Sequence, residues 1–232
     1  MVSDRVMTPL ATTVLSRLTE AYAGAADAER APAMRAYMRD QFEFLGIPSP
    51  RRLPLDRQVL AGLDRPDEAD LRDLALACWR KPEREYQYFA CGWLRRHVRR
   101  ATPDLLPTLR HLIATKSWWD TVDTLASDTV GALVRENPAL VSTMDGWVRE
   151  DGIWVARTAI LHQLTYKQGT DSDRLFRYCL ARAGHRDFFI RKAIGWALRQ
   201  YSGSDPEAVR GFLARYGDQL SPLSVREASK HL

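Results

Sequence analysis

Cysteines and long apolar runs are scarce in this chain of 232 residues. The three cysteines, Cys78, Cys91 and Cys179, are odd in number and lie near no histidine pair, which argues against a disulfide framework and against a zinc site. We expect buried free thiols and no bound metal. No segment approaches the roughly 18 apolar residues of a membrane span, and the N-terminus lacks the layout of a secretory signal. The sequence therefore predicts a cytoplasmic protein.

Lysine is also rare, because only five of the 34 basic residues are lysines and the others are arginines. The planar fork of arginine matches phosphate oxygens. A net charge of +5 and a pI near 9.3 also favour a polyanionic partner. A GC-rich genome replaces lysine with arginine as well, so composition alone leaves both explanations open.

Convincing strand alternation is absent, and prolines instead mark the starts of helices. Seven prolines each precede a stretch with helical periodicity, as expected for the first helical turn. Four of them follow a residue suited to an N-cap. We predict an all-helical chain of about ten to twelve helices, forming a single domain over residues 1–232. The prolines are Pro32, Pro66, Pro82, Pro103, Pro138, Pro206 and Pro222, and the caps are Thr102, Asn137, Asp205 and Ser221.

A weak internal period connects two segments. Residues 157–164, RTAILHQL, and 191–198, RKAIGWAL, share one pattern and start 34 residues apart. Such a period corresponds to one helix-turn-helix unit of an α-solenoid. One further step toward the N-terminus reaches Asp123. The period thus predicts equivalent places on successive helices for Asp123, Arg157 and Arg191.

The segment KSWWDTVD, residues 116–123, contains two carboxylates three residues apart. Ser117 and Asp120 have the spacing of a capping box, which would begin a helix that runs to about Glu136. Asp123 lies one turn too far along to cap that helix. Its charge must therefore be solvated, paired or used.

The same helix separates the two tryptophans. Trp118 shares a face with Val122 and Leu125, which predicts a position in the core. Trp119 lies about 100° further around the helix and shares its face with Asp123. We expect one tryptophan in the core and the other beside a carboxylate.

A second helical segment, FFIRKAIGWALRQYS, combines an aromatic ring with cations. Lys192, Trp196 and Arg199 share one face, and an apolar face is formed by Ile190, Ile194 and Leu198. A tryptophan between basic residues favours nucleic-acid binding, with cations on phosphates and the ring on sugars or bases. The alternative is a buried tryptophan covered by long basic side chains.

A third segment, MRAYMRDQFEFLGIPSPRR, covers residues 34–52. Tyr37 lies beside basic residues and off the predicted core face, and GIPSPRR is interpreted as an extended basic turn suited to a phosphate strand or to solvent. The core face consists of Met34, Met38, Phe42 and Leu45.

Together with TKSWWDTVDTLA, WVARTAILHQLTYKQ and SPLSVREASKHL, these segments resemble the AlkD family of bacterial DNA alkylation-repair glycosylases. The likeness extends in order from about Ala31 to the last residue, and residues before about Arg30 match nothing specific. The resemblance implies a right-handed α-solenoid of HEAT-like repeats with a concave, basic DNA-binding face. It further implies a monofunctional glycosylase that releases 3-methyladenine and 7-methylguanine from duplex DNA and leaves an abasic site.

The resemblance also assigns roles to individual residues. Asp123 matches the family's catalytic carboxylate, and Thr165 stands where a basic residue is expected. The residues expected to bind substrate or DNA are Trp119, Trp196, Tyr37, Arg157 and Arg199, to which the basic face of the second segment adds Lys192.

This chemistry requires no cofactor. A purine alkylated at N3 or N7 is already cationic and can leave without a general acid, while a carboxylate stabilises the oxocarbenium-like sugar and orients water. The resemblance implies that the lesion stays in the helix, although base chemistry usually requires flipping. We expect a nucleoid-associated monomer that binds alkylated double-stranded DNA. The alternative is a non-catalytic helical-repeat scaffold that binds DNA or a protein.

Overall fold

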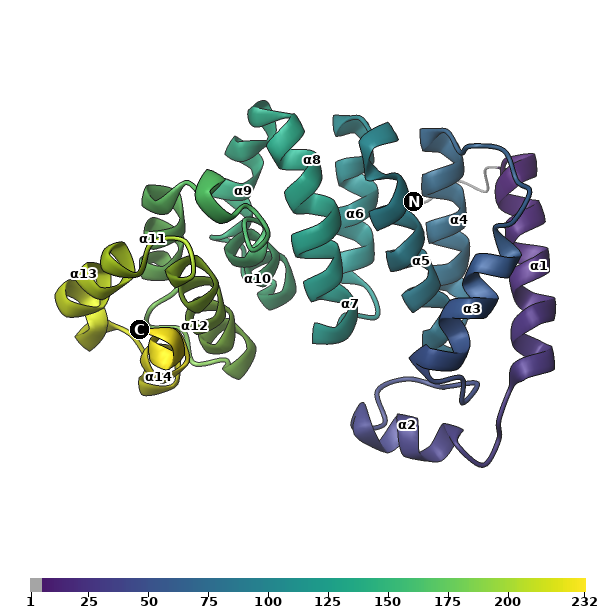
Figure 1. Ribbon diagram of the computed structural model, residues 1–232, viewed down its shortest axis with the longest axis horizontal. Coiled ribbons are helices and arrows are strands. Elements are labelled where there is room, and N and C mark those ends of the chain that lie inside the picture. Colours follow the sequence, from purple (N-terminus) through teal and green to yellow (C-terminus); the bar gives the residue numbers. More distant parts are fainter. Residues whose placement is uncertain (1–5) are drawn as a thin grey trace. The chain divides into compact units, whose positions relative to one another are not determined.

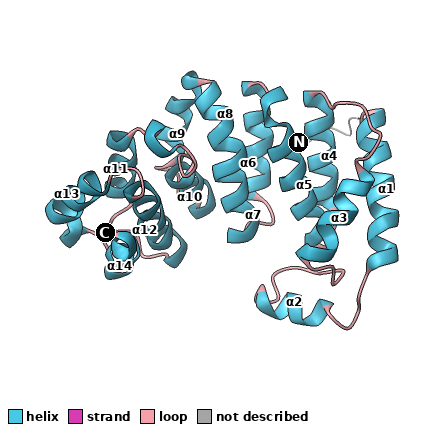
Figure 2. Cartoon of the chain, in the orientation of Figure 1, coloured by secondary structure: helices cyan, strands magenta, loops and turns pink. Residues whose placement is uncertain are grey.

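The computed structural model describes residues 6–232, which are predominantly helical (Figures 1 and 2). No β-strand occurs among these residues, apart from an isolated bridge between Glu43 and Glu83. The predicted all-α class is therefore confirmed. The described residues form fourteen α-helices rather than ten to twelve. They divide into two compact units, the first ending at Thr108 and the second starting at Leu109. That the two units form one domain stays a prediction.

Unit 1 is built mainly from three long helices, of which α1 packs on α4 and α4 packs on α5. The shorter helix α3 packs on α1. Its core includes Leu18, Leu71, Leu74 and Leu94, which are fully buried. The helices are α1 (Pro9–Ala25), α2 (Ala31–Tyr37), α3 (Ser49–Val59), α4 (Glu68–Arg80) and α5 (Arg84–His97).

The segment after α2 departs from the predicted helical face. Arg39 and Asp40 adopt left-handed backbone angles, with φ of 54° and 53°, so the helix ends at Tyr37. Beyond this break the helical spacing no longer applies, and Phe44 is buried where Phe42 was predicted. The predicted core face is thus wrong after Met38, which is itself buried.

The stretch GIPSPRR is a helix start rather than an extended basic turn. Ser49 is the first residue of α3, and proline is favoured in a first turn because no hydrogen bond is lost there. Just before it, the carboxylate of Glu85 accepts hydrogen bonds of 3.0 Å from the backbone N–H groups of Leu45, Gly46 and Ile47. This buried carboxylate fixes the turn that precedes α3.

Unit 2 repeats a pair of helices several times. A π-helical segment, Leu125–Val130, joins α7 and α8 into one continuous helix that ends at Glu136, as predicted. The α-helices are α6 (Leu106–Ala114), which crosses the boundary between the units, α7 (Trp119–Thr124), α8 (Gly131–Glu136), α9 (Val141–Trp147), α10 (Ile153–Leu161), α11 (Ser172–Ala181), α12 (Phe188–Ser202), α13 (Pro206–Tyr216) and α14 (Pro222–Ala228).

Contacts within unit 2 confirm the period of about 34 residues. Arg157 bonds to Asp123, 34 positions earlier, and the Tyr166 hydroxyl donates to the carbonyl of Gly131, 35 positions earlier. The first part of α10 therefore lies beside the first part of the α7–α8 helix, and the turn after α10 lies beside its later part, so the two helices run in the same direction. Helix α12 in turn packs on α10 and α14. Helical repeats that stack in succession in this way form an α-solenoid.

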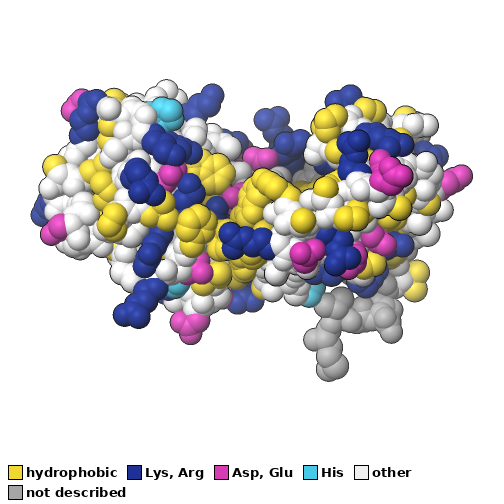
Figure 3. Space-filling model, turned by 90° about the horizontal axis from the view of Figure 1, so that it is seen from below, with side chains coloured by type: hydrophobic (Ala, Val, Ile, Leu, Met, Phe, Trp, Pro, Cys, Tyr) yellow, Lys and Arg dark blue, Asp and Glu magenta, His cyan; other side chains and the backbone are white. Residues whose placement is uncertain are grey.

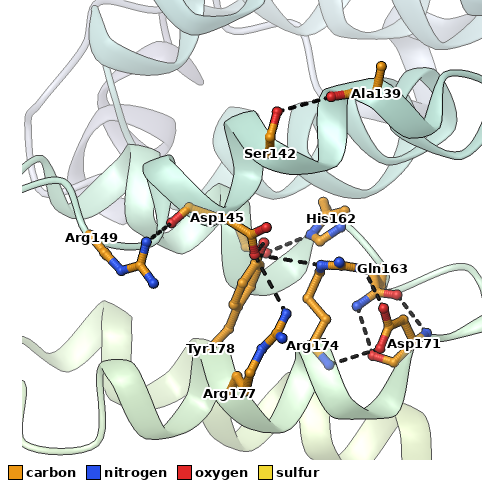
Figure 4. A network of polar contacts seen from close by, with 11 residues as sticks. Ala139, Ser142, Asp145, Arg149, His162, Gln163, Asp171, Arg174, Arg177 and Tyr178 are labelled. Atoms are coloured by element: carbon orange, nitrogen blue, oxygen red, sulfur yellow. Dashed lines mark hydrogen bonds and ion pairs between the residues drawn. The ribbon is translucent and has the colours of Figure 1, made fainter.

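The other helix of each pair follows the same period. Figure 4 shows Asp145 of α9 facing α11, where it accepts a 2.8 Å hydrogen bond from the Tyr178 hydroxyl, 33 positions later. Arg174 lies 3.7 Å from the same carboxylate. Nearby, Gln163 both accepts from and donates to the backbone of Asp171. A polar network therefore holds successive repeats together on the side of α9 and α11.

Three of the four predicted N-caps are confirmed. The side chains of Thr102, Asp205 and Ser221 each accept a hydrogen bond from a backbone N–H in the first turn that follows. Asn137 is wrong, because its side-chain amide donates to the carbonyl of Leu133 and closes the preceding helix. None of the helices in the described part of the chain combines the length and apolarity required to cross a membrane.

Candidate functional site

A cavity of about 370 Å³ opens in unit 2 between helices α7, α10, α12 and α14. This size is in the range of ligand-binding clefts. Figure 3 shows basic side chains beside hydrophobic ones on one face of the molecule. Six of the seven residues predicted for the site lie in its wall. The lining consists of Trp119, Asp123, Arg157, Phe188, Phe189, Lys192, Trp196, Arg199 and Glu227.

Asp123 and Arg157 form a bidentate ion pair at this wall. Arg157 donates from Nε to Oδ1 of Asp123 over 2.7 Å and from Nη2 to Oδ2 over 2.8 Å. It also donates from Nη1 to the carbonyl of Phe189. The Arg157 side chain is 4% exposed and the Asp123 side chain 13%. Arg157 is thus committed to holding the carboxylate, and its predicted contact with DNA stays a prediction.

The environment of Asp123 acts on its proton affinity in two ways. Burial, the larger effect, raises the pKa of the carboxyl above its ordinary value, because the charged form loses hydration. The hydrogen bonds and charge of Arg157 act in the opposite direction. The Ser127 hydroxyl donates to the backbone carbonyl of Asp123 over 2.9 Å, at the point where the helix enters its π-helical segment. Such segments are frequent at functional sites.

The two neighbouring tryptophans separate as predicted. Trp119 lines the cavity with Asp123. Trp118 packs instead in an aromatic cluster, with ring centroids 5.8 Å from Trp154 and 5.1 Å from Phe189. Trp118 is half-buried rather than fully in the core, so its predicted burial is only partly met.

The predicted capping box at the start of this helix is wrong. The N-cap position belongs to Trp118, and no side-chain hydrogen bond caps the helix there. The Ser117 hydroxyl donates to the carbonyl of Ile113 over 2.6 Å and so belongs to the end of α6. The positive φ of Lys116, 49°, turns the chain between the two helices. The helix begins one residue later than the predicted capping box requires, so Ser117 lies outside its cap.

Helix α12 presents the face predicted from its spacing. Lys192, Trp196 and Arg199 line the cavity one turn apart from each other. The opposite face is fully buried and consists of Ile190, Ile194 and Leu198. Arg191 follows the repeat register but does not join the site, because its Nε donates to the carbonyl of His185. The contact of Arg157 with Asp123 confirms the first step of the register, whereas the Arg191 side chain 34 residues further on has a different role.

Tyr37 is the seventh predicted residue. It ends α2 in unit 1, and its side chain is among the exposed large hydrophobic ones, at 72% exposure. Its membership of the site stays a prediction. Thr165, where a basic residue was expected, donates to the carbonyl of Ser127 over 3.4 Å in unit 2.

Three lining residues were not predicted: Phe188, Phe189 and Glu227. The phenylalanines begin α12 directly before the predicted face, so their place in the sequence offered a signal. The sequence contained little signal for Glu227, because steps of 34 residues align it with Ala159 and Ala193, which are buried core positions. The repeat period thus predicted a core residue where the structure has a carboxylate.

The comparison with known families decides what this scaffold is. Residues 18–232 match the model of the DNA alkylation repair enzymes. The chain belongs to the DNA alkylation repair enzyme family. The family match begins earlier than Ala31, where the resemblance was expected to start, and includes part of α1. It extends over nearly the whole of both units.

Solved structures agree with the family. A predicted DNA alkylation repair enzyme from Enterococcus faecalis superposes with a TM-score of 0.82 and 34% identity, over 89% of this chain and 96% of that one. The protein smu.31 from Streptococcus mutans UA159 has a TM-score of 0.63 and 12% identity, over 96% of this chain and 99% of that one, and supports the fold alone. No curated protein matches the chain. As a family member, the chain is associated with DNA and with the repair of alkylation damage.

Proposed function

We propose that this protein is a monofunctional DNA glycosylase that hydrolyses the N-glycosidic bond of cationic N-alkylpurines in duplex DNA. The substrates in this proposal are 3-methyladenine and 7-methylguanine, and the product is an abasic site. The observation that carries the proposal is the ionisable carboxylate of Asp123, held by Arg157 in the wall of an open cavity with Trp119 and Trp196.

In this mechanism the bond between C1′ and the purine nitrogen breaks first. The bonding electrons neutralise the positive charge of the alkylated base, so the base leaves without protonation. The sugar develops oxocarbenium character, which the negative charge of Asp123 stabilises. A water molecule then adds to C1′, with its proton accepted by Asp123 and passed to solvent. Arg157 keeps both oxygens of Asp123 at the cavity wall throughout.

The tryptophans supply selectivity in this scheme. A cationic nucleotide between Trp119 and Trp196 gains about 0.5–2 kcal/mol for each ring, whereas a neutral base gains less. The open cavity lets the rings approach a lesion that remains stacked in the helix, which is how we propose the reaction proceeds. Lys192 and Arg199, on either side of Trp196 along α12, are placed for phosphates next to the lesion.

The decisive experiment measures free 7-methylguanine released from a methylated duplex by the wild type and by Asp123→Asn. We expect release by the wild type and little by the variant, with duplex binding retained in both. Asp120→Asn, one turn earlier on the same helix and outside the cavity wall, is the matched control and is expected to retain release. Salt-dependent binding without release by any of these proteins would contradict the proposal and favour a non-catalytic scaffold.

A further inference from the structure

A second carboxylate, Glu227 of α14, lies in the cavity wall among three cations. One of its oxygens, Oε1, lies 3.1 Å from Nζ of Lys192 and 2.8 Å from Nζ of Lys230. The other, Oε2, accepts a hydrogen bond of 3.1 Å from Nη1 of Arg199. The Glu227 side chain is only 7% exposed, whereas the three cations are partly open to solvent. Each oxygen of the carboxylate thus holds one of the two cations that flank Trp196.

The packing of α14 on α12 is built to bring this carboxylate to the cavity. A β-carbon at Gly195 would lie 2.5 Å from Cβ of Glu227 and 2.8 Å from the carbonyl oxygen of Ser224, so only glycine permits this approach. The Ser224 hydroxyl donates to the carbonyl of Arg191 over 2.8 Å and fixes α14 along α12. Glu227 therefore reaches Lys192 and Arg199 because two backbones meet closely at Gly195.

A carboxylate in a wall that faces DNA carries a cost, since it repels phosphates. The surrounding cations hold the pKa of Glu227 down to about 2, so the repelling charge persists at any pH of interest. Asp123 has a chemical role that explains its charge, but Glu227 faces no such step in the proposed mechanism. The role of Glu227 is therefore to be found in its effect on the neighbouring cations. Long basic side chains lose much conformational freedom when they bind, and a fixed partner removes that cost beforehand.

We propose that Glu227 is a positioning residue that holds Lys192 and Arg199 on either side of Trp196 for contact with the phosphates that flank the lesion. This inference rests on the proposed function, because that function supplies the lesion. The contact of Lys192 and Arg199 with phosphates can nevertheless be measured on any duplex. It makes an unusual prediction. Removal of a negative charge from a DNA-binding wall ordinarily strengthens binding and steepens its salt dependence, whereas loss of a positioning residue has the opposite effect.

The test compares Glu227→Gln with Glu207→Gln, because each substitution removes one carboxylate and so raises the net charge by one. Glu207 lies on α13, is 79% exposed and pairs with Arg210, three residues later, so it is a control for charge. Duplex binding is measured at several salt concentrations, alongside single-turnover excision of 7-methylguanine and the thermal midpoint of each protein. We expect the slope of log K against log salt to fall by about one in Glu227→Gln, equivalent to one lost phosphate contact, and to be maintained in Glu207→Gln.

Excision by Glu227→Gln at saturating protein should fall about tenfold, because the DNA around the lesion is less well fixed. A slope in Glu227→Gln equal to or steeper than that of Glu207→Gln would overturn the inference. If the wild type releases no base while the slope still falls in Glu227→Gln, the positioning role stands and the glycosylase proposal fails.

A second variant keeps the test valid if Glu227→Gln does not fold. Glu227→Asp retains the charge but shortens the side chain, so its carboxylate no longer reaches both cations. We expect a smaller fall in the salt slope at a nearly unchanged thermal midpoint. A slope equal to that of the wild type would show that charge alone matters and would overturn the positioning role.

Discussion

Two largely buried aspartate–arginine pairs, one in each unit, have similar chemistry and different surroundings. In unit 1, Nη1 of Arg52 lies 2.6 Å from Oδ2 of Asp56, four residues later on α3. In unit 2, Arg157 contacts Asp123 from another helix, 34 positions away. Burial is the largest effect on both carboxyls and raises the pKa of each above its ordinary value. Ion pairing alone therefore does not distinguish them.

The difference lies in what else each carboxylate meets. The remaining oxygen of Asp56, Oδ1, accepts a 2.6 Å hydrogen bond from the hydroxyl of Tyr22, which is fully buried in the core of unit 1. Among the described residues, the Asp123 carboxylate accepts its hydrogen bonds from Arg157, and its other side opens on a cavity with Trp119. A buried pair closed by a hydroxyl contributes to stability, whereas a pair open to a cavity can act on a ligand.

The largest expected effect comes from exchanging each aspartate for asparagine. Asp123→Asn should lower excision by at least about 100-fold, because the charge facing the developing oxocarbenium is lost. Asp56→Asn should leave excision near the wild-type value and lower the free energy of unfolding by about 1–3 kcal/mol. Single-turnover kinetics and chemical denaturation of both variants test this. Equal losses of excision in the two would remove the distinction between them.

A smaller effect is expected from adding a methyl group at two helical glycines. A β-carbon at Gly131 would lie 2.1 Å from the carbonyl oxygen of His162, so Gly131→Ala should push α10 away from α8 and cost about 1–3 kcal/mol. Because α10 carries Arg157, excision should fall as well. Gly24 of α1 has open space around it, and Gly24→Ala should stabilise unit 1 by about 0.5–1 kcal/mol. Thermal melts of the two variants that shift in the same direction would contradict the prediction.

Trp196→Ala should lower excision of small methyl lesions about tenfold, in line with the loss of one ring contact to a cation. Binding to undamaged duplex should change less, because the flanking cations remain. Excision rates are compared with binding to an unmodified duplex of the same sequence. Parallel losses in both would identify Trp196 as a packing residue instead.

The smallest effect is a shift along the pH axis. Because the proposed reaction requires ionised Asp123, excision should rise with pH through a midpoint above the ordinary pKa of an aspartate. Since folding raises the pKa of both aspartates, their protonated forms are favoured in the folded state, and any stability they contribute is greatest at low pH and lost as pH rises. Lowering the pH should therefore abolish excision, while the titration of these two aspartates does not destabilise the folded protein. A pH profile of excision and a melt at each pH test this, and Asp56→Asn should leave the profile unchanged.

Much of the architecture was predictable because it depends on local spacing. Prolines and caps marked helix starts, and apolar positions at helical intervals separated the faces of α12. The period of 34 residues, found from one repeated pattern, correctly placed Asp123 opposite Arg157. Errors arose where the local rule was interrupted, as at Arg39 and Asp40, whose positive φ angles end α2 early. The membership of Tyr37 in the site and the union of the two units in one domain stay predictions.

The sequence by itself determined the helices and their repeat, because these follow from side chains three, four or 34 residues apart. The family and most of the lining of the cavity followed instead from the resemblance of its motifs to those of a known family. Tertiary structure alone decided that Arg157 is a buried partner of Asp123 and that Glu227 holds the cations beside Trp196. The physical reason is distance between backbones. A repeat period predicts which helices are neighbours, but the close approach at Gly195 decides whether a side chain at a core register reaches the cavity.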